Sequence, residues 1–372
     1  MNRIDSDFDE YLAGLDTKTF SSSKKEIERT YRAVLKKTGL KRKTAGPKKV
    51  GRICLIAAAA VVCTAVSAAA AGFNVGELFR GYFEHDARAA ADIPASAASL
   101  TQSQIAVLDK SGKTIEQSVT DNGMTVTLKA AVCDQSSAYL LLDVTAPEGT
   151  VLDRDDYSFI IKLAELDIDD VGNYSGSCEL RLLKDNDPTD NKKSFVLEMG
   201  YSGFDMRGRT FHLELSDFST LRQEKAEDYF TPVVKGDWTF DPITLQSDTA
   251  TKELTVNQVT HFNSNAHSNA PADVGSKKAE TSDQCTVDSI SLSSFSAIVH
   301  FTGKDLKTKG DSFAVPNSLA LNLKDGTKVD VPFCDGGSSY KTKAYYVWRF
   351  DEPVDVNSVS SVTLGDLTVP VS

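Results

Sequence analysis

The sequence predicts a mainly β protein in which two extracytoplasmic β-sandwiches of the immunoglobulin-like kind follow a single transmembrane helix and a short α-helical cytoplasmic head. Three observations support this prediction. Residues 1–52 are basic, residues 53–75 contain no charged side chain, and from about residue 105 apolar residues recur at every second position between turn signals. The expected parts are the head (1–52), the membrane helix (53–73), a juxtamembrane helix and linker (74–104), the first sandwich (105–247) and the second sandwich (248–372).

Charge is divided unevenly along the chain. Residues 1–52 contain 14 Lys and Arg against 7 Asp and Glu, whereas the rest of the chain contains 27 against 45. Parts of opposite net charge usually face different surroundings, and the acidic bulk argues against nucleic acid as a partner. The 372 residues are enough for two or three domains, each with its own core.

The apolar segment 53–73 is about as long as a helix that crosses roughly 30 Å of hydrocarbon. A cluster of Lys and Arg precedes it, and the positive-inside rule keeps such a cluster in the cytoplasm. We therefore expect a single-pass protein of the cell membrane, with its N-terminus in the cytoplasm and its C-terminal bulk outside. A cleaved signal peptide is the alternative, because residues 68–70 (AAA) fit a cleavage site, although a charged lead of 52 residues is longer than a normal n-region.

The head contains a predicted amphipathic helix from about residue 24 to residue 38. Ser23 and Glu26 form a capping box, and Gly39 supplies a C-terminal stop. A narrow apolar face buries little surface alone, so it packs within the head, on the membrane surface or against a partner. The candidate partner-binding residues recur at i, i+4, i+7 and i+8: Ile27, Tyr31, Val34 and Leu35.

Short strand-like segments fill the chain beyond the linker. Residues 121–123 (DNG) are a strong hairpin signal. Two pairs of segments echo one another: residues 238–242 (WTFDP) with 348–353 (WRFDEP), and residues 125–138 with 286–297. Two related sandwiches would explain these echoes, with each Trp and the Phe two positions later pointing into a core.

Four cysteines lie beyond the apolar segment, two in each expected sandwich. An oxidising exterior permits one disulfide per sandwich, but single cysteines without short spacings also suit buried apolar positions, so the sequence leaves both interpretations open. The candidates are Cys133 and Cys178 in the first sandwich, and Cys285 and Cys334 in the second.

The sequence contains no recognisable catalytic or cofactor motif. The acidic runs at 167–172 and 185–190 depart from the ligand positions of a calcium loop, the five His are scattered, and neither a nucleophile elbow nor a Gly-rich phosphate loop occurs. We therefore expect a non-enzymatic protein without a cofactor or metal ion.

Two regions carry a family resemblance. Residues 118–128 (SVTDNGMTVTL) and 138–144 (AYLLLDV), which follow a single apolar segment, resemble the DUF4179 family of Firmicutes membrane proteins. Residues 346–353 (YVWRFDEP) and 362–369 (VTLGDLTV) are similar to the immunoglobulin-like DUF5643 module that often follows it. The resemblance implies an anti-sigma-factor-like regulator paired with an extracytoplasmic-function (ECF) sigma factor, and no active site is implied. The head departs from many anti-sigma domains because it contains no His or Cys to bind zinc.

Two functions follow as expectations. In the first, the chain is a membrane-anchored regulator whose residues 1–52 sequester an ECF sigma factor while the outer β modules sense an extracytoplasmic signal. In the second, it is a cell-surface binding or adhesion module whose sandwiches hold a cell-wall polymer or a protein ligand.

Overall fold

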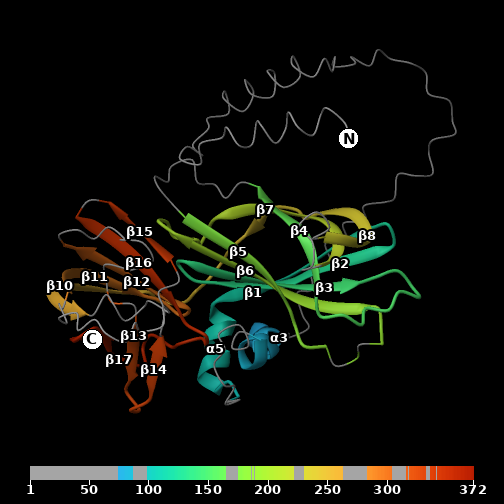
Figure 1. Ribbon diagram of the computed structural model, residues 1–372. Helices are drawn as coiled ribbons and strands as arrows, with labels where there is room; N and C mark the ends of the chain where they lie inside the picture. The colour runs from blue at the N-terminus through green and yellow to red at the C-terminus, as the bar shows by residue number, and fades with distance from the viewer. Residues whose placement is uncertain are drawn as a thin grey trace, which may run out of the picture. The chain divides into compact units, whose positions relative to one another are not determined.

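The protein is mainly β, as the period-two patterning predicts. The computed structural model describes residues 74–86, 99–164, 175–185, 187, 189–221, 230–262, 283–303, 316, 318–331, 336–340 and 342–372. Within these residues the strands form four antiparallel sheets (Figure 1). Buried apolar side chains form two separate cores between these sheets.

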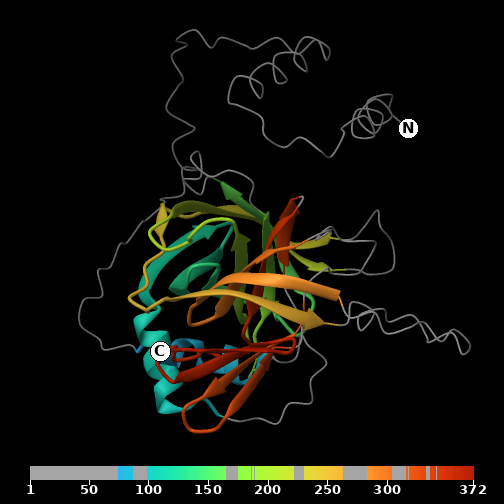
Figure 2. The same cartoon turned by 90° about the vertical axis from the view of Figure 1, so that its left-hand side faces the viewer.

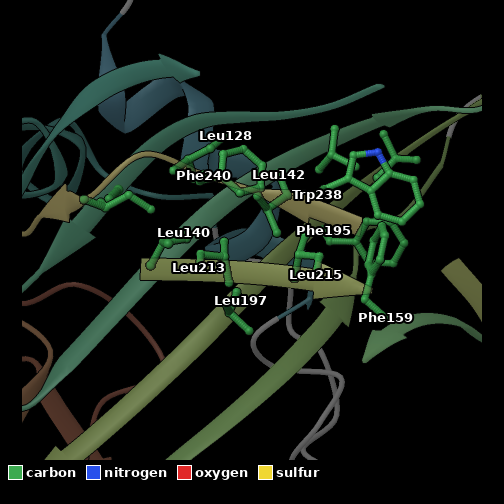
Figure 3. Close-up of a cluster of buried hydrophobic side chains, with 14 of the residues drawn as sticks. Leu128, Leu140, Leu142, Phe159, Phe195, Leu197, Leu213, Leu215, Trp238 and Phe240 are labelled. Atoms are coloured by element: carbon green, nitrogen blue, oxygen red, sulfur yellow. The ribbon is translucent and has the colours of Figure 1, made fainter. Parts of the chain in front are cut away.

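The first sandwich combines a sheet of strand order β1-β2-β3-β6-β5 with a sheet of order β4-β7-β8, and β9 pairs with β7. Buried and half-buried residues alternate at the start of β2, so Met124, Val126 and Leu128 point into the core. Figure 3 shows part of this core, where Trp238 lies against Phe159 with ring centroids 5.6 Å apart. The strands are β1 (Gly112–Asp121), β2 (Met124–Cys133), β3 (Ser137–Thr145), β4 (Tyr157–Ala164), β5 (Ser175–Leu182), β6 (Lys192–Ser202), β7 (Thr210–Leu221), β8 (Phe230–Thr239) and β9 (Ile243–Thr244).

The second sandwich combines a sheet of order β10-β11-β12-β16-β15 with a sheet of order β14-β13-β17-β18. Its core contains Trp348 and Phe350, both buried. The strands are β10 (Lys252–Phe262), β11 (Asp283–Leu292), β12 (Ser296–Thr302), β13 (Leu319–Leu323), β14 (Lys328–Val331), β15 (Gly336–Tyr340), β16 (Lys343–Arg349), β17 (Val359–Leu364) and β18 (Leu367–Pro370).

Both sandwiches have the strand order of a constant-type immunoglobulin domain, in which strands A, B, E and D form one sheet and C, F and G the other. In the first sandwich these are β2-β3-β6-β5 and β4-β7-β8. In the second they are β11-β12-β16-β15 and β13-β17-β18. Each sandwich also has an additional strand before A, which is β1 in the first and β10 in the second.

The two sandwiches share the same local irregularities. The pairing of β2 with β3 shifts between Leu128 and Ala130, and the pairing of β11 with β12 shifts at the corresponding place, between Val287 and Ser289. The additional strand bulges opposite these residues in both sandwiches. Each bulge contains a residue with positive φ: Glu116 at 56° and Asn257 at 50°. A bulge retained at the same register position in both sandwiches indicates an internal repeat.

The two sequence echoes differ in what they represent. The echo between residues 125–138 and 286–297 falls on corresponding hairpins, β2–β3 and β11–β12. The echo between the Trp segments does not, because Trp238 lies in β8, the G strand, and Trp348 lies in β16, the E strand. The residue that corresponds to Trp348 is Met199. Trp348 pairs with Ala297 of β12 and Met199 pairs with Ala138 of β3, and these two Ala occupy the same position in strand B. Both Trp side chains are nevertheless buried in a core, as predicted.

The remaining described elements are the helices α3 (Val75–Gly81) and α5 (Gln102–Lys110) and the π-helical turn η1 (Tyr82–Asp86). In both views α3 (blue) lies beside α5 (teal), and the two helices contact one another (Figure 1, Figure 2). None of the helices in the described part of the chain has the length and apolar character of a membrane span. The predicted span at 53–73 and the predicted head at 1–52 lie outside the described residues.

Gly112 marks a close approach of two strands where α5 leads into β1. A Cβ at this position would collide with the backbone of Ala131 on β2. We expect Gly112→Ala to lower the free energy of unfolding by about 1–3 kcal/mol, because backbone atoms cannot move aside as a side chain can. Chemical denaturation measures this change. Gly81→Ala is the matched control, since a Cβ at Gly81 meets no atom within 4 Å and should leave the unfolding midpoint unchanged or slightly raised. An equal effect of both substitutions would contradict the prediction.

Candidate functional site: the contact between the two sandwiches

Two corresponding turns face each other across the contact between the sandwiches. The first turn, residues 134–136, joins β2 to β3, and the second turn, residues 293–295, joins β11 to β12. The turns have the same internal structure, because the same backbone hydrogen bonds close them. These bonds run from Asp134 N to Ser137 O and from Ser293 N to Ser296 O, each 2.9 Å long.

The carboxylate of Asp134 lies at the centre of this contact, and the residue is 0% exposed. Its Oδ1 accepts hydrogen bonds from its own turn, from the backbone N of Ser136 (2.9 Å) and Ser137 (2.8 Å). Its Oδ2 accepts three from the second sandwich: Ser293 Oγ (2.6 Å), Phe295 N (2.9 Å) and Ser296 Oγ (2.8 Å). A buried carboxylate is tolerated when its lone pairs are engaged in this way. Asp134 therefore joins the two sandwiches through one of its two oxygens.

Further polar side chains surround the carboxylate. Gln135 makes two bonds with Ser291, because its Nε2 donates to Ser291 O (3.1 Å) and its Oε1 accepts from Ser291 Oγ (2.7 Å). Ser136 Oγ donates to Ser296 Oγ over 2.7 Å. These four side chains, Gln135, Ser136, Ser291 and Ser296, are buried and hydrogen-bonded. They form a satisfied polar network that is distinct from either apolar core.

The second turn also places an aromatic side chain from the second sandwich against the helices. The ring of Phe295 stacks on Phe83 of η1, with centroids 5.8 Å apart and an interplanar angle of 7°. It also meets Tyr139 of β3 edge-on at 5.4 Å. Phe79, Tyr82 and Phe83 are buried in the same cluster, on the outer face of β2, β3 and β6. The start of the segment expected as a juxtamembrane helix and linker is thus helical, is packed against the first sandwich and contacts the second.

Polar contacts fix this helical segment at both ends. Asn74 caps α3, and Gly76 N donates to Asp109 Oδ1 of α5 over 2.8 Å. The hydroxyl of Tyr82 donates to Glu198 Oε1 over 2.5 Å, and burial raises the pKa of Tyr82 well above its usual range, which keeps this donor protonated. On α5, Gln104 Nε2 donates to Glu352 of the second sandwich over 2.8 Å.

The comparisons with known proteins leave the family of the chain open. No protein-family model matches it. No curated protein matches it either. One solved structure, the crystal structure of the conserved domain protein from Bacillus anthracis, is 14% identical, covering 68% of this chain and 75% of that chain with a TM-score of 0.44.

The candidate partner-binding residues of the head lie outside the described residues, so their role stays a prediction. They are Ile27, Tyr31, Val34 and Leu35.

Three of the four cysteines beyond residue 75 are described, and all three carry free thiols: Cys133 and Cys285 buried, Cys178 exposed. Cys334 lies outside the described residues. Cys133 and Cys178 sit on one row across the sheet, separated by β3 and β6. Three strand spacings amount to about 14 Å, whereas a disulfide requires Cα atoms within about 7 Å. The fold therefore separates this pair too widely for a bridge, and the two buried cysteines fit the apolar interpretation.

Thiol labelling tests this arrangement. At pH 8 we expect the exposed Cys178 to react with a maleimide while Cys133 and Cys285 react only after denaturation. Burial raises the pKa of all three thiols, to about 11 at Cys178 and about 12 at Cys285, so the expected contrast comes chiefly from the exposure of Cys178 to the reagent. Peptide mass spectrometry assigns the labels. Labelling of Cys133 and Cys178 that appears only after reduction would contradict the free-thiol assignment.

The described Asp side chains of the acidic run at 185–190 have partners within the chain. Asp185 pairs with Lys193 over 2.6 Å, and Asp187 accepts from Thr189 N and Oγ1. In the described part of the chain, no group of three or more His, Cys, Asp or Glu side chains is placed to bind a metal ion. The other run, 167–172, falls among the residues that are not described.

A polar hollow of about 290 Å³ lies on the exposed face of the first sheet. Several of its charged and polar groups have partners within the chain, among them the buried Lys193, which pairs with Asp185. Lys129 pairs with Glu116 at 3.0 Å, and Ser194 Oγ donates to Asp143 over 2.7 Å. The hollow therefore presents no buried, unpaired group that would select a ligand.

Sequence reasoning missed Asp134. The run 134–137 (DQSS) between two strands reads as an ordinary turn, since an Asp side chain commonly accepts from the backbone two residues on. That local role accounts for one oxygen of Asp134. The second oxygen binds a turn more than 150 residues away, and the only sequence signal for that pairing was the echo between the two hairpins.

Proposed function

We propose that this chain is a membrane-anchored regulator whose cytoplasmic head holds an ECF sigma factor and whose two sandwiches receive a signal outside the cell. The basic head, the uncharged span at 53–73, the acidic β-rich bulk and the family resemblance support the layout. In the proposed complex the sigma factor packs on the apolar face formed by Ile27, Tyr31, Val34 and Leu35. Burying these side chains contributes several kcal/mol before ordering costs, which suits a reversible clamp.

One observation carries the sensing part of this proposal. The helix α3 begins at Val75, two positions after the proposed span ends, and runs directly into η1. Phe79 and Phe83 of this segment are buried against the first sandwich, and Phe83 stacks on Phe295 of the second. A rearrangement of either sandwich therefore acts on the residues next to the span, which a loose tether would not permit.

Co-purification tests the clamp. The full chain with a C-terminal tag, extracted from native membranes, is expected to recover an ECF sigma factor. Tyr31→Asp should abolish the recovery, because it places a charge in the apolar face. Ala33→Asp is the matched control, since helical periodicity puts the same carboxylate on the opposite face and the sigma factor should still be recovered. Recovery of no sigma factor by the unchanged chain would contradict the proposal.

Transcript profiling separates the regulator from the cell-surface binding module. For a regulator, deletion of residues 1–39 should raise the transcripts of one sigma-dependent set of genes, as should Tyr31→Asp. For an adhesion module that uses the head only as an anchor, the same changes should not alter the transcript levels of these genes. Unchanged transcripts in both variants would favour the surface module and a ligand in the cell wall or on another protein.

A further inference from the structure

We propose that the polar contact around Asp134 is a latch that fixes the second sandwich to the helical segment 74–86, and that opening it releases Phe295 from Phe83 without unfolding either sandwich. As a route for the outer signal this rests on the proposed function, but the latch itself is a property of the described residues and is tested without a sigma factor.

The first step of the argument concerns the two oxygens of Asp134. Oδ1 holds the first turn together, while Oδ2 holds the second sandwich. The second turn closes itself as well, because Ser293 N donates to Ser296 O over 2.9 Å. Both turns therefore keep their internal bonds when Oδ2 loses its three partners. Water can then satisfy Oδ2 and its former donors, as it does for other polar groups at a surface.

The second step concerns the independence of the two sandwiches. Each has its own apolar core, with no residue shared between them. The contact between them consists of the hydrogen-bonded network and of the apolar contact of Phe295 with Phe83 and Tyr139, which belongs to neither core. Interfaces between domains of one chain resemble transient protein–protein interfaces. Opening therefore exposes little of either core. This is the condition for a two-state element whose closed form is favoured by the bonds to Asp134, by burial of the Phe295 ring, and by the bonds of Gln104 to Glu352 and of Arg349 to Ser137.

The third step concerns Phe295, which links the latch to the helices. Its backbone N donates to Asp134 Oδ2 over 2.9 Å, while its ring stacks on Phe83 and meets Tyr139. The ring cannot stay between these partners once the second turn moves away from Asp134. Opening or closing of the latch therefore changes the packing of η1 directly. This turn follows α3, which begins just after the proposed span.

Hydrogen exchange on the full chain in lipid nanodiscs tests the latch. The test variant is Ser293→Ala with Ser296→Ala, which removes two of the three donors to Oδ2 and leaves both backbone turns in place. We expect amide exchange in residues 75–86 to rise about tenfold or more, as the loss of two buried hydrogen bonds implies. Exchange in the core strands β16 and β17 should stay as in the unchanged chain.

The matched control is Ser358→Ala with Ser360→Ala. These hydroxyls also donate within the second sandwich, to Asp355 O over 2.7 Å and to Asn322 O over 2.8 Å, but away from the contact. The control should leave exchange in 75–86 unchanged. If the test variant leaves this segment as protected as the control does, the proposal is overturned. It is equally overturned if β16 and β17 lose protection together with 75–86, since the contact would then support the fold of the second sandwich.

A cross-link tests the closed state independently. Ser136 Oγ and Ser296 Oγ lie 2.7 Å apart, so Ser136→Cys with Ser296→Cys is expected to form a disulfide across the contact. Oxidation should slow exchange in 75–86 below that of the reduced form, and dithiothreitol should reverse this. Equal exchange in the two forms would overturn the latch. A chain that shows these exchange changes but recovers no sigma factor would retain the latch and lose the regulatory proposal.

Discussion

Asp134→Ala is expected to lower the free energy of unfolding of the first sandwich by about 2–4 kcal/mol, because its turn loses both bonds to Oδ1, and to open the contact with the second sandwich. The substitution removes an acceptor that engages five donors: Ser136 N, Ser137 N, Ser293 Oγ, Phe295 N and Ser296 Oγ. The contact is buried, so water does not replace the lost bonds while it stays closed. Chemical denaturation of the full chain, followed by tryptophan fluorescence, measures the change.

Two further variants make this result specific. Asp134→Asn keeps one acceptor oxygen and replaces the other with an NH₂ donor, so its effect should be intermediate. Asp325→Ala removes an Asp from an exposed turn, where Asp325 Oδ1 accepts from Thr327 N over 2.8 Å, and should leave the midpoint nearly unchanged. If Asp134→Ala and Asp325→Ala had the same midpoint, the buried network would contribute nothing to stability.

Trp238→Ala is expected to lower the free energy of unfolding by about 3–5 kcal/mol, because it leaves a large cavity in the first sandwich. Trp238 is 0% exposed, and its Nε1 donates to Met124 O over 3.0 Å. Trp238→Phe keeps much of the ring volume but leaves this carbonyl without its donor, so a loss of about 1–3 kcal/mol is expected. Circular dichroism of the β signal follows unfolding in these variants, since one of the two Trp has been removed.

An exposed aromatic residue provides the comparison for Trp238. Phe230 on β8 is 41% exposed, and Phe230→Ala should change the free energy of unfolding by less than about 1 kcal/mol. A loss at Trp238→Ala no greater than at Phe230→Ala would show that the Trp238 pocket is less closely packed than the structure indicates. A loss at Trp238→Phe equal to that at Trp238→Ala would assign the whole effect to the hydrogen bond.

The strands could be predicted from the sequence because their signals are local. At the tip of the β1–β2 hairpin, Asn122 and Gly123 have positive φ values of 48° and 79°, as the run at 121–123 predicts. Alternation placed Val126 and Leu128 in the core, where the structure also has them. Such patterns involve residues only two positions apart, so they can be recognised in a single sequence without knowledge of distant contacts.

The parts that could not be predicted depend on contacts between distant segments. The resemblance of the two Trp segments suggested corresponding strands, yet burial of Trp and Phe at alternate positions is a property that a G strand and an E strand share. The helix at 75–81 was expected to lead into a linker, because its apolar side chains carry no sign of which surface they cover. Phe295, which covers part of that segment, is an isolated Phe in a Ser-rich turn.

The repeat also bears on which sandwiches can pair with each other. Asp134 and Ser293 occupy corresponding positions, yet they face one another at 2.6 Å as acceptor and donor. Two copies of the first sandwich in this arrangement would bring two buried carboxylates together, and like charges at that distance repel. Two copies of the second sandwich would leave Ser293 Oγ, Phe295 N and Ser296 Oγ without the carboxylate that accepts from them. Divergence at this one position therefore makes the two sandwiches non-interchangeable. It also discourages neighbouring chains from associating through two first sandwiches or two second sandwiches.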